Sequence, residues 1–185
     1  MKKILLPAII FVLAVVLIFI AFGSKGNKKN NHIKPELTQT QKELPEVGYS
    51  APGFTLKDIK SGEQLLSNYK GKAVLLNFWA SWCGPCRSEM PSMESLYQRM
   101  KDRNFEILAV SVDQRDTKRV LDFVSKYKLT FPVLLNPEGN VAIQYRVTAL
   151  PTSFVIDKKG VIKAKVVGAR NWSDPNLVSQ IESLL

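Results

Sequence analysis

The stretch Trp79–Pro91, WASWCGPCRSEMP, contains the only two cysteines of the 185-residue chain, Cys83 and Cys86. Two cysteines separated by two residues can serve a metal site, a structural disulfide or a redox cycle. A structural zinc site needs about four ligands, but the chain has no third cysteine, and its single histidine, His32, lies in a polar segment near the N-terminus. A disulfide that closes so small a loop constrains little of the unfolded chain, and Cys–His catalysis would need a histidine that residues 46–185 do not contain. The pair therefore favours redox chemistry.

The segments on either side of the cysteines suit a redox role. Ala73–Ala80, AVLLNFWA, is a near-continuous apolar run that predicts a central buried strand, and a helix is predicted to begin at about Gly84. Cys83 then lies at the helix N-terminus, where unpaired backbone N–H groups and the helix dipole favour a thiolate, the attacking species in disulfide exchange. Cys86 lies one turn further along the helix. It can attack the sulfur of Cys83 and so resolve a mixed disulfide between Cys83 and a substrate. Pro85 stiffens the small ring that a Cys83–Cys86 disulfide closes.

The rest of the pattern predicts an α/β fold with a layered sheet, because strands and helices alternate and the chain ends in a hairpin and a helix. An N-terminal β-hairpin is expected around the turn at Ser61-Gly62. Further strands are expected at Phe105–Asp113, Phe131–Leu135, Ser153–Asp157 and Val161–Val167, and helices after the cysteines and at Thr117–Tyr127, Asn140–Tyr145 and Asp174–Leu185. Thr117 is a candidate N-cap of its helix.

Two motifs together resemble the thioredoxins. NFWASWCGPC resembles the thioredoxin active site, and LPT, Leu150–Thr152, resembles the cis-proline loop of that fold. The resemblance implies a thioredoxin-like fold in which a cis Pro151 faces the reactive sulfur and neighbouring backbone pairs with the substrate chain. It implies no bound cofactor and no metal. The substrate contacts that it implies are Trp82, Gly84, Pro85, Leu150 and Pro151.

The chain from Val47 onward resembles one branch of these proteins, the ResA/TlpA-like oxidoreductases. The shared features are the opening VGYSAPGFTL, the cysteine motif, a central insert from about Asp113 to Val147, and PTSFVIDKKGVI. The resemblance implies a membrane-tethered, extracytoplasmic enzyme that reduces disulfides in exported proteins, including the haem-binding cysteines of apocytochrome c, with electrons from a CcdA/DsbD-like membrane protein. ResA proper has an acidic residue after the first cysteine. Gly84 stands there in this chain, which suggests a sister of ResA with a different partner.

Glu89 is a further candidate for the catalytic site. Thioredoxins typically place a buried Asp six residues before the first cysteine, but this chain has Asn77 there, and an amide cannot accept a proton from Cys86. Glu89 follows Cys86 by three residues on the same predicted helix, and the ResA-like branch has an active-site Glu at this position. If it acts there, it should be partly buried, with a pKa raised by desolvation. The alternative is an ordinary acidic residue in the first turn, stabilised by the helix dipole.

The N-terminal part predicts a membrane anchor. Residues 4–22 form an apolar run of 19 residues, which at about 1.5 Å per residue nearly spans a hydrocarbon core of about 30 Å. A cleaved signal peptide is the alternative, although its apolar region is usually shorter. Residues 1–3 are then a short cytoplasmic head and residues 23–45 a flexible linker. The thioredoxin-like domain, residues 46–185, is expected outside the cytoplasm, although the lysines flanking the run are nearly balanced and do not decide the orientation.

Charge distribution and motif spacing argue against three other functions: nucleic-acid binding, a peroxidase and a non-catalytic docking domain. Residues 1–45 hold 7 Lys and 2 Glu, which is +5 of the net charge of +10. The other basic residues are scattered without stacking aromatics, so nucleic-acid binding is not expected. A peroxiredoxin-like peroxidase shares the APxFxL opening, but its usual P-x-x-x-[TS]-x-x-C pattern fails because Leu76 and Ala80 occupy the Pro and Thr positions. A non-catalytic peptide-docking domain is the third alternative, and the intact cysteine pair disfavours it.

Overall fold

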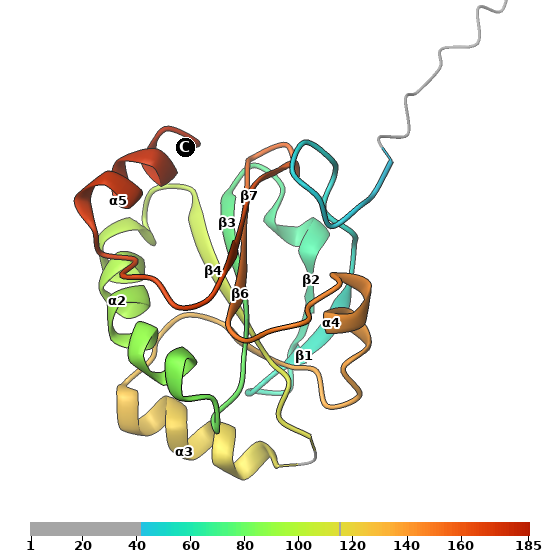
Figure 1. Cartoon of the computed structure of the whole chain (residues 1–185), viewed down its shortest axis with the longest axis vertical. Helices are drawn as coiled ribbons and strands as arrows, with labels where there is room; N and C mark the ends of the chain where they lie inside the picture. The colour runs from blue at the N-terminus through green and yellow to red at the C-terminus, as the bar shows by residue number, and fades with distance from the viewer. Residues whose placement is uncertain (1–41, 115) are drawn as a thin grey trace, which may run out of the picture. The chain divides into compact units, whose positions relative to one another are not determined.

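Seven strands form one mixed sheet (Figure 1). The computed structural model describes residues 42–114 and 116–185. The strands are β1 (Thr55–Asp58), β2 (Glu63–Leu65), β3 (Ala73–Trp79), β4 (Phe105–Ser111), β5 (Val133–Leu135), β6 (Thr152–Ile156) and β7 (Ile162–Val167). They lie in the order β2-β1-β5-β4-β3-β6-β7. Strand β3 pairs in parallel with β4 and antiparallel with β6, so both of its edges are satisfied.

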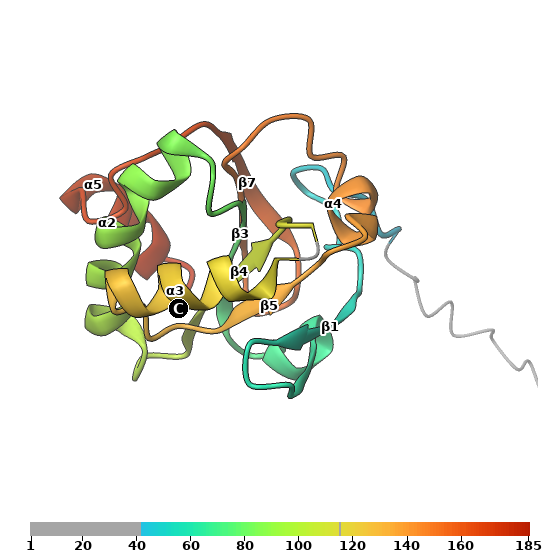
Figure 2. The same cartoon turned by 90° about the horizontal axis from the view of Figure 1, so that it is seen from below.

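Helices cover both faces of the sheet. Figures 1 and 2 show α2 and α5 on one side and α4 on the other. The helices are α2 (Gly84–Met100), α3 (Thr117–Tyr127), α4 (Asn140–Gln144) and α5 (Pro175–Glu182), with a 3-10 turn at Leu66–Tyr69. Strand β3 is buried along its whole length because its side chains alternate between two apolar clusters. Leu75 and Trp79 belong to the cluster under α2, α3 and α5, whereas Leu76 and Phe78 belong to the cluster that contains Tyr145 beside α4.

The structure confirms the predicted thioredoxin-like α/β fold and refines several element ends. The expected N-terminal hairpin is β1 and β2, with Thr55 opposite Leu65. Strand β5 is shorter than predicted and begins after Pro132, which has no amide donor for a ladder. The expectation that Thr117 caps its helix is wrong. Asp116 is the N-cap, and its carboxylate accepts the backbone N–H of Arg119 at 3.0 Å.

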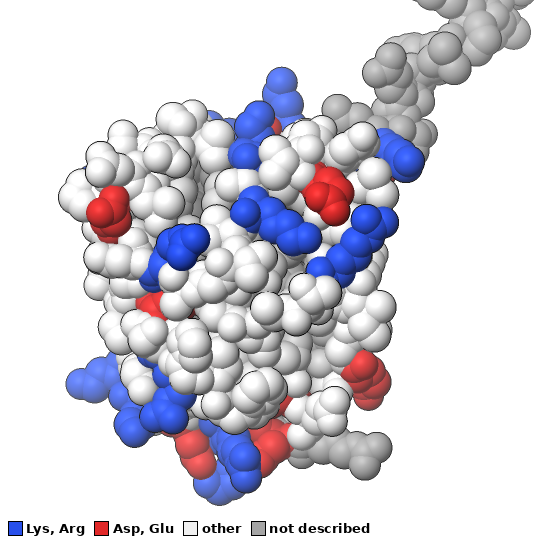
Figure 3. Space-filling view, in the orientation of Figure 1, with Lys and Arg blue, Asp and Glu red and all other residues white. Residues whose placement is uncertain are grey.

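The predicted head, anchor and nearly all of the linker, residues 1–41, lie outside the described residues. Within residues 42–114 and 116–185, no helix is long and apolar enough to cross a membrane. At the end of the predicted linker, Glu43 forms a bridge with Ser50, and the Leu44 amide donates to the Ser50 carbonyl at 3.1 Å. On the face shown in Figure 3, basic side chains occupy several separate places and form no continuous stripe.

Candidate active site

Cys83 and Cys86 lie where β3 passes into α2, and they are joined by a disulfide with Cα atoms 5.3 Å apart. Cys83 is the N-cap residue of α2, and its sulfur accepts the backbone N–H of Cys86 at 3.2 Å. This position directs helix amides at the sulfur of Cys83, which favours its thiolate in the reduced protein. Cys86 is completely buried, whereas Cys83 reaches a surface groove. Of the two cysteines, Cys83 is therefore the one that borders the groove.

The turn before Cys83 is held by a buried carboxylate at the end of the neighbouring strand. Asp113 accepts the backbone N–H of Ser81 at 2.9 Å and the Ser81 hydroxyl at 2.5 Å, and it accepts the Ser111 hydroxyl at 2.8 Å. The carboxyl ends of the parallel strands β3 and β4 lie side by side, which is why a residue just after β4 reaches this turn. Sequence analysis did not single out Asp113, although its place at the end of a predicted buried strand was a usable signal.

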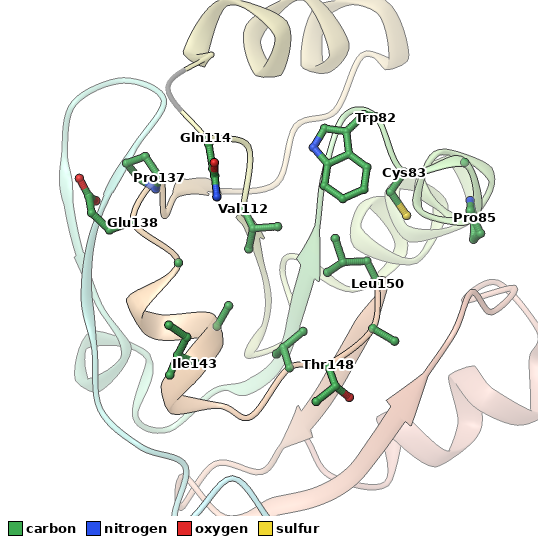
Figure 4. A pocket seen from close by; sticks show the side chains of 15 residues that line it. Trp82, Cys83, Pro85, Val112, Gln114, Pro137, Glu138, Ile143, Thr148 and Leu150 are labelled. Atoms are coloured by element: carbon green, nitrogen blue, oxygen red, sulfur yellow. The ribbon is translucent and has the colours of Figure 1, made fainter.

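A groove of about 720 Å³ runs beside Cys83 (Figure 4). Five residues proposed from the sequence as functional line it: Trp82, Cys83, Gly84, Pro85 and Leu150. The opposite wall comes from the central insert, where Ile143 of α4 is 75% exposed, and Trp82 is 63% exposed. Large apolar side chains that stay exposed on both walls make this groove a candidate binding surface. The insert's contribution to the site was not anticipated, because NVAIQY indicated only a short helix.

The predicted cis proline is confirmed, because the Leu150-Pro151 bond is cis. Pro151 is buried, and its carbonyl accepts the Gly168 amide at 2.8 Å, whereas its neighbour Leu150 reaches the groove beside Cys83. The Thr152 hydroxyl donates to the Ala149 carbonyl at 2.7 Å, which ties the loop to the start of β6. The two motifs that resemble thioredoxin thus meet at one place in the fold.

Glu89 lies on the buried side of α2, with 2% of its surface exposed. Its Oε1 accepts the side-chain amide N–H of Asn77 at 2.9 Å, and its Oε2 accepts the indole N–H of Trp172 at 3.0 Å and the backbone N–H of Arg170 at 3.1 Å. Burial raises the pKa of Glu89, and these hydrogen bonds oppose the rise because they stabilise the charged form. The expected burial and the direction of the pKa shift are confirmed.

Asn77 occupies the position where thioredoxins carry an acid, and it is completely buried. Its amide nitrogen donates to Glu89 and to the Ser153 hydroxyl, both at 2.9 Å, whereas its Oδ1 has no partner among the described residues. Asn77 therefore acts as a hydrogen-bond donor to the carboxylate of Glu89 on α2. In the described part of the chain, no group of three His, Cys, Asp or Glu residues is placed to hold a metal ion.

Comparisons with known proteins agree with this geometry. Residues 47–165 match the AhpC/TSA family. The thiol-disulfide oxidoreductase ResA of Geobacillus kaustophilus is 43% identical over 135 residues, which cover 73% of this chain and 77% of that protein. The thioredoxin-like protein YneN of Bacillus subtilis is 41% identical over 134 residues, covering 71% and 78%.

Solved structures show the same fold. A candidate thiol:disulfide interchange protein DsbE from Chlorobium tepidum superposes with a TM-score of 0.70 at 36% identity, covering 77% of this chain and 99% of that one. StoA from Bacillus subtilis superposes with a TM-score of 0.59 at 29% identity, covering 72% and 96%.

Proposed function

The chain belongs to the AhpC/TSA family and to its ResA-like thiol-disulfide oxidoreductases, and on this basis we propose that it reduces disulfides in exported proteins on the outer side of the membrane. The observation that carries the proposal is the asymmetry of the cysteine pair. Cys83 reaches a groove large enough for a polypeptide segment, whereas Cys86 is enclosed behind it. Such a pair exchanges electrons with a substrate through one sulfur and releases the substrate with the other.

The reduction proceeds in two exchanges. The Cys83 thiolate attacks one sulfur of the substrate disulfide, the substrate S–S bond breaks, and the other substrate sulfur leaves as a thiolate that takes a proton from water. The Cys86 thiol then loses its proton and attacks Cys83. The bond between Cys83 and the substrate breaks, the second substrate thiolate leaves, and the Cys83–Cys86 disulfide forms. The substrate gains two electrons and two protons. The enzyme, which starts with Cys83 as a thiolate, loses two electrons and the one proton of Cys86, and water supplies the other proton.

Glu89 is the proposed proton acceptor for Cys86. The two residues lie three positions apart on α2, and both belong to its buried side. No histidine occurs in residues 46–185, and Asn77 cannot take a proton. A carboxylate whose pKa is raised by burial is closer in proton affinity to a thiol than an exposed one is, which suits it to this transfer. Glu89 then releases the proton to the departing substrate thiolate.

The groove supports a polypeptide substrate. Its walls are mostly apolar, with Trp82, Leu150 and Pro85 next to the reactive sulfur and Ile143 across from them (Figure 4). We propose that residues flanking the substrate cysteine pack between these walls. The apocytochrome c cysteines are one candidate, because several relatives are ResA proteins. A Cβ added at Gly84 would meet no atom within 4 Å, so the fold does not require glycine there and the residue is free to tune partner choice.

The proposed location rests on the N-terminal sequence. The 19-residue apolar run in residues 4–22 is long enough for an anchor, and an exported reductant then needs electrons from across the membrane. A CcdA/DsbD-like membrane protein is the proposed donor. A reporter fused after Leu185 should be active only outside the cytoplasm, and the protein should stay with the membrane fraction. Release of the catalytic part into the medium would contradict the anchor.

The function is tested by trapping substrates in intact cells with Cys86→Ala, which cannot resolve the mixed disulfide at Cys83. Exported proteins with cysteine pairs should be recovered and released by a reductant, and the Cys83→Ala/Cys86→Ala double variant should recover none. In vitro, the reduced chain should reduce insulin. A chain that instead oxidises reduced substrates, or leaves insulin unchanged, would overturn the reductive function.

A peroxidase is the second candidate, because the chain shares the APxFxL opening of the peroxiredoxins and residues 47–165 match the AhpC/TSA family. The structure gives it little support. Leu76 and Ala80, which stand where peroxidases carry Pro and Thr, are both buried core residues. A peroxide-consumption assay with the reduced chain should therefore show no turnover above that of Cys83→Ala.

A further inference from the structure

The loop after β7, residues 168–174, is bound to the helix that carries the cysteines. In Figure 1 this C-terminal loop leaves the edge of the sheet and runs beside α2 before α5 begins. The Ser92 hydroxyl of α2 accepts the Trp172 backbone N–H at 3.0 Å and donates to the Glu89 carbonyl at 2.7 Å. The Trp172 indole and the Arg170 amide both donate to Glu89 itself. The loop is therefore hydrogen-bonded to α2 at Glu89 and Ser92.

Trp172 is placed for this contact by its surroundings. It is completely buried, and its ring belongs to the apolar cluster that contains Cys83 and Cys86. Most buried indole N–H groups have a hydrogen-bond partner, and for Trp172 that partner is Glu89. Trp79 offers a contrast, because it is buried in the same cluster but its indole nitrogen has no partner among the described residues. Burial of a tryptophan here does not by itself bring about a bond to the carboxylate.

The hydrogen bonds differ between the two carboxylate oxygens of Glu89. Each oxygen has two lone pairs. The C-terminal loop occupies both sites on Oε2, through the Trp172 indole and the Arg170 amide. Oε1 accepts one bond, from Asn77, and keeps one site for a proton. The loop thus leaves Oε1 as the oxygen with an unoccupied site.

We propose that Trp172 is a positioning residue for thiol-disulfide exchange: its indole N–H, together with the Arg170 amide, holds Oε2 so that Oε1 of Glu89 takes the proton of Cys86. This inference rests on the proton-transfer role proposed above for Glu89. It makes the C-terminal loop, more than 80 positions from the cysteines, part of the machinery that releases substrate. Trp172 acts through Glu89 and touches neither substrate nor the attacking sulfur in this scheme.

The groups that face Glu89 set the direction of the effect. Strand β3 presents Asn77, and behind it β6 presents Ser153, and both are neutral. The loop presents Arg170, whose charge lowers the pKa of Glu89, and Cys86 lies three positions before Glu89 on the buried side of α2. Losing the indole N–H removes a bond that favours the carboxylate, so the pKa of Glu89 rises further. A smaller fraction of Glu89 can then accept a proton at neutral pH.

The test separates the two exchanges by mixing the reduced full chain with one equivalent of a chromogenic aromatic disulfide. The fast release of coloured thiolate reports attack by Cys83, and the second release reports resolution by Cys86. Trp172→Phe should shift the acid limb of the second phase upward by about one pH unit, the effect expected for a lost hydrogen bond to a charged group. The first phase should change less than about twofold, because Cys83 keeps its helix N-terminal site.

Trp79→Phe is the matched control, because it removes a buried indole that makes no bond to Glu89. It should leave the acid limb of the second phase unchanged even if it lowers stability. Glu89→Gln should abolish that limb, and adding Trp172→Phe to Glu89→Gln should have no further effect on it.

The outcomes distinguish the two proposals. A wild-type pH profile in Glu89→Gln would overturn the role of Glu89. A changed profile in Glu89→Gln with a wild-type profile in Trp172→Phe, or a shift in Trp172→Phe that persists in the double variant, would overturn the role of Trp172 alone.

Discussion

Replacing Asp113 by alanine tests whether the turn before Cys83 is held for catalysis or only for stability. The carboxylate accepts two hydrogen bonds from Ser81 and one from Ser111, so the substitution leaves the Ala80–Trp82 turn without its attachment to β4. Trp82 is one wall of the groove and Cys83 follows it directly. Loosening this turn should therefore move both the nucleophile and a substrate-contacting side chain.

The magnitude follows from the bonds that are lost. Each hydrogen bond to a charged group contributes about 1.5–3 kcal/mol, but removing Asp113 also removes the cost of keeping a carboxylate buried. The half-buried Ser81 amide and hydroxyl gain water, whereas the buried Ser111 hydroxyl loses its acceptor. We expect a net loss of about 2–3 kcal/mol in the free energy of unfolding. Activity should fall by at least about tenfold, because a misplacement of about 1 Å at a reacting centre can cost ~100-fold.

Asp58→Ala is the matched control. Asp58 also accepts three hydrogen bonds, from the Lys60 amide, the Gly62 amide and the Gln64 side chain, but it lies in the β1–β2 hairpin, separated from β3 by two strands. Urea unfolding, alkylation of Cys83 in the reduced chain and insulin reduction are measured for both variants. If Asp113→Ala loses stability while its alkylation and reduction rates match those of Asp58→Ala, the turn has no catalytic role and the reasoning fails.

Two further predictions concern the groove and the buried carboxylate. Ile143→Ser should raise the KM for protein disulfides several-fold and leave the rate with a small aromatic disulfide unchanged. Leu121 is an exposed apolar residue of α3 outside the groove, so Leu121→Ser should alter neither quantity. Equal KM values for Ile143→Ser and the parent would exclude the insert as a wall of the substrate groove. Because burial raises the pKa of Glu89 above its ordinary 4.5, the folded oxidised chain holds a proton that the unfolded chain has released, so its stability falls as pH rises through that window. Glu89→Gln lacks this titration, so between about pH 4 and about pH 8 its free energy of unfolding, measured in urea, should rise with pH relative to that of the parent. A difference between the two proteins that does not change with pH would contradict the raised pKa.

Local sequence patterns were sufficient for much of the fold. Strand β3 was predictable because both of its faces are buried, which produces a continuous apolar run, and α2 because apolar side chains recur at helical spacing after Cys86. The cap of α3 was assigned to Thr117 instead of Asp116, since both residue types cap helices and only the backbone geometry distinguishes them. Among the groove residues, those beside the cysteines came from the motif, whereas Ile143 belongs to a helix too short to show which side it exposes.

Trp172 illustrates why the rest of the site was not predictable. Glu89 was predicted because it follows Cys86 by three residues on one helix and because the ResA-like branch, which the chain resembles, has a Glu at this position; both signals lie within a few residues of the motif. Its partners Arg170 and Trp172 are 81 and 83 positions away, in a loop with neither helical nor strand periodicity. A carboxylate on α2 and an indole in a loop meet only because α2 and that loop cover the same face of the sheet, a consequence of the strand order. The proton affinity of Glu89 is therefore set by the topology of the fold, and a substitution in the C-terminal loop should alter exchange at Cys86 without altering any residue of the motif.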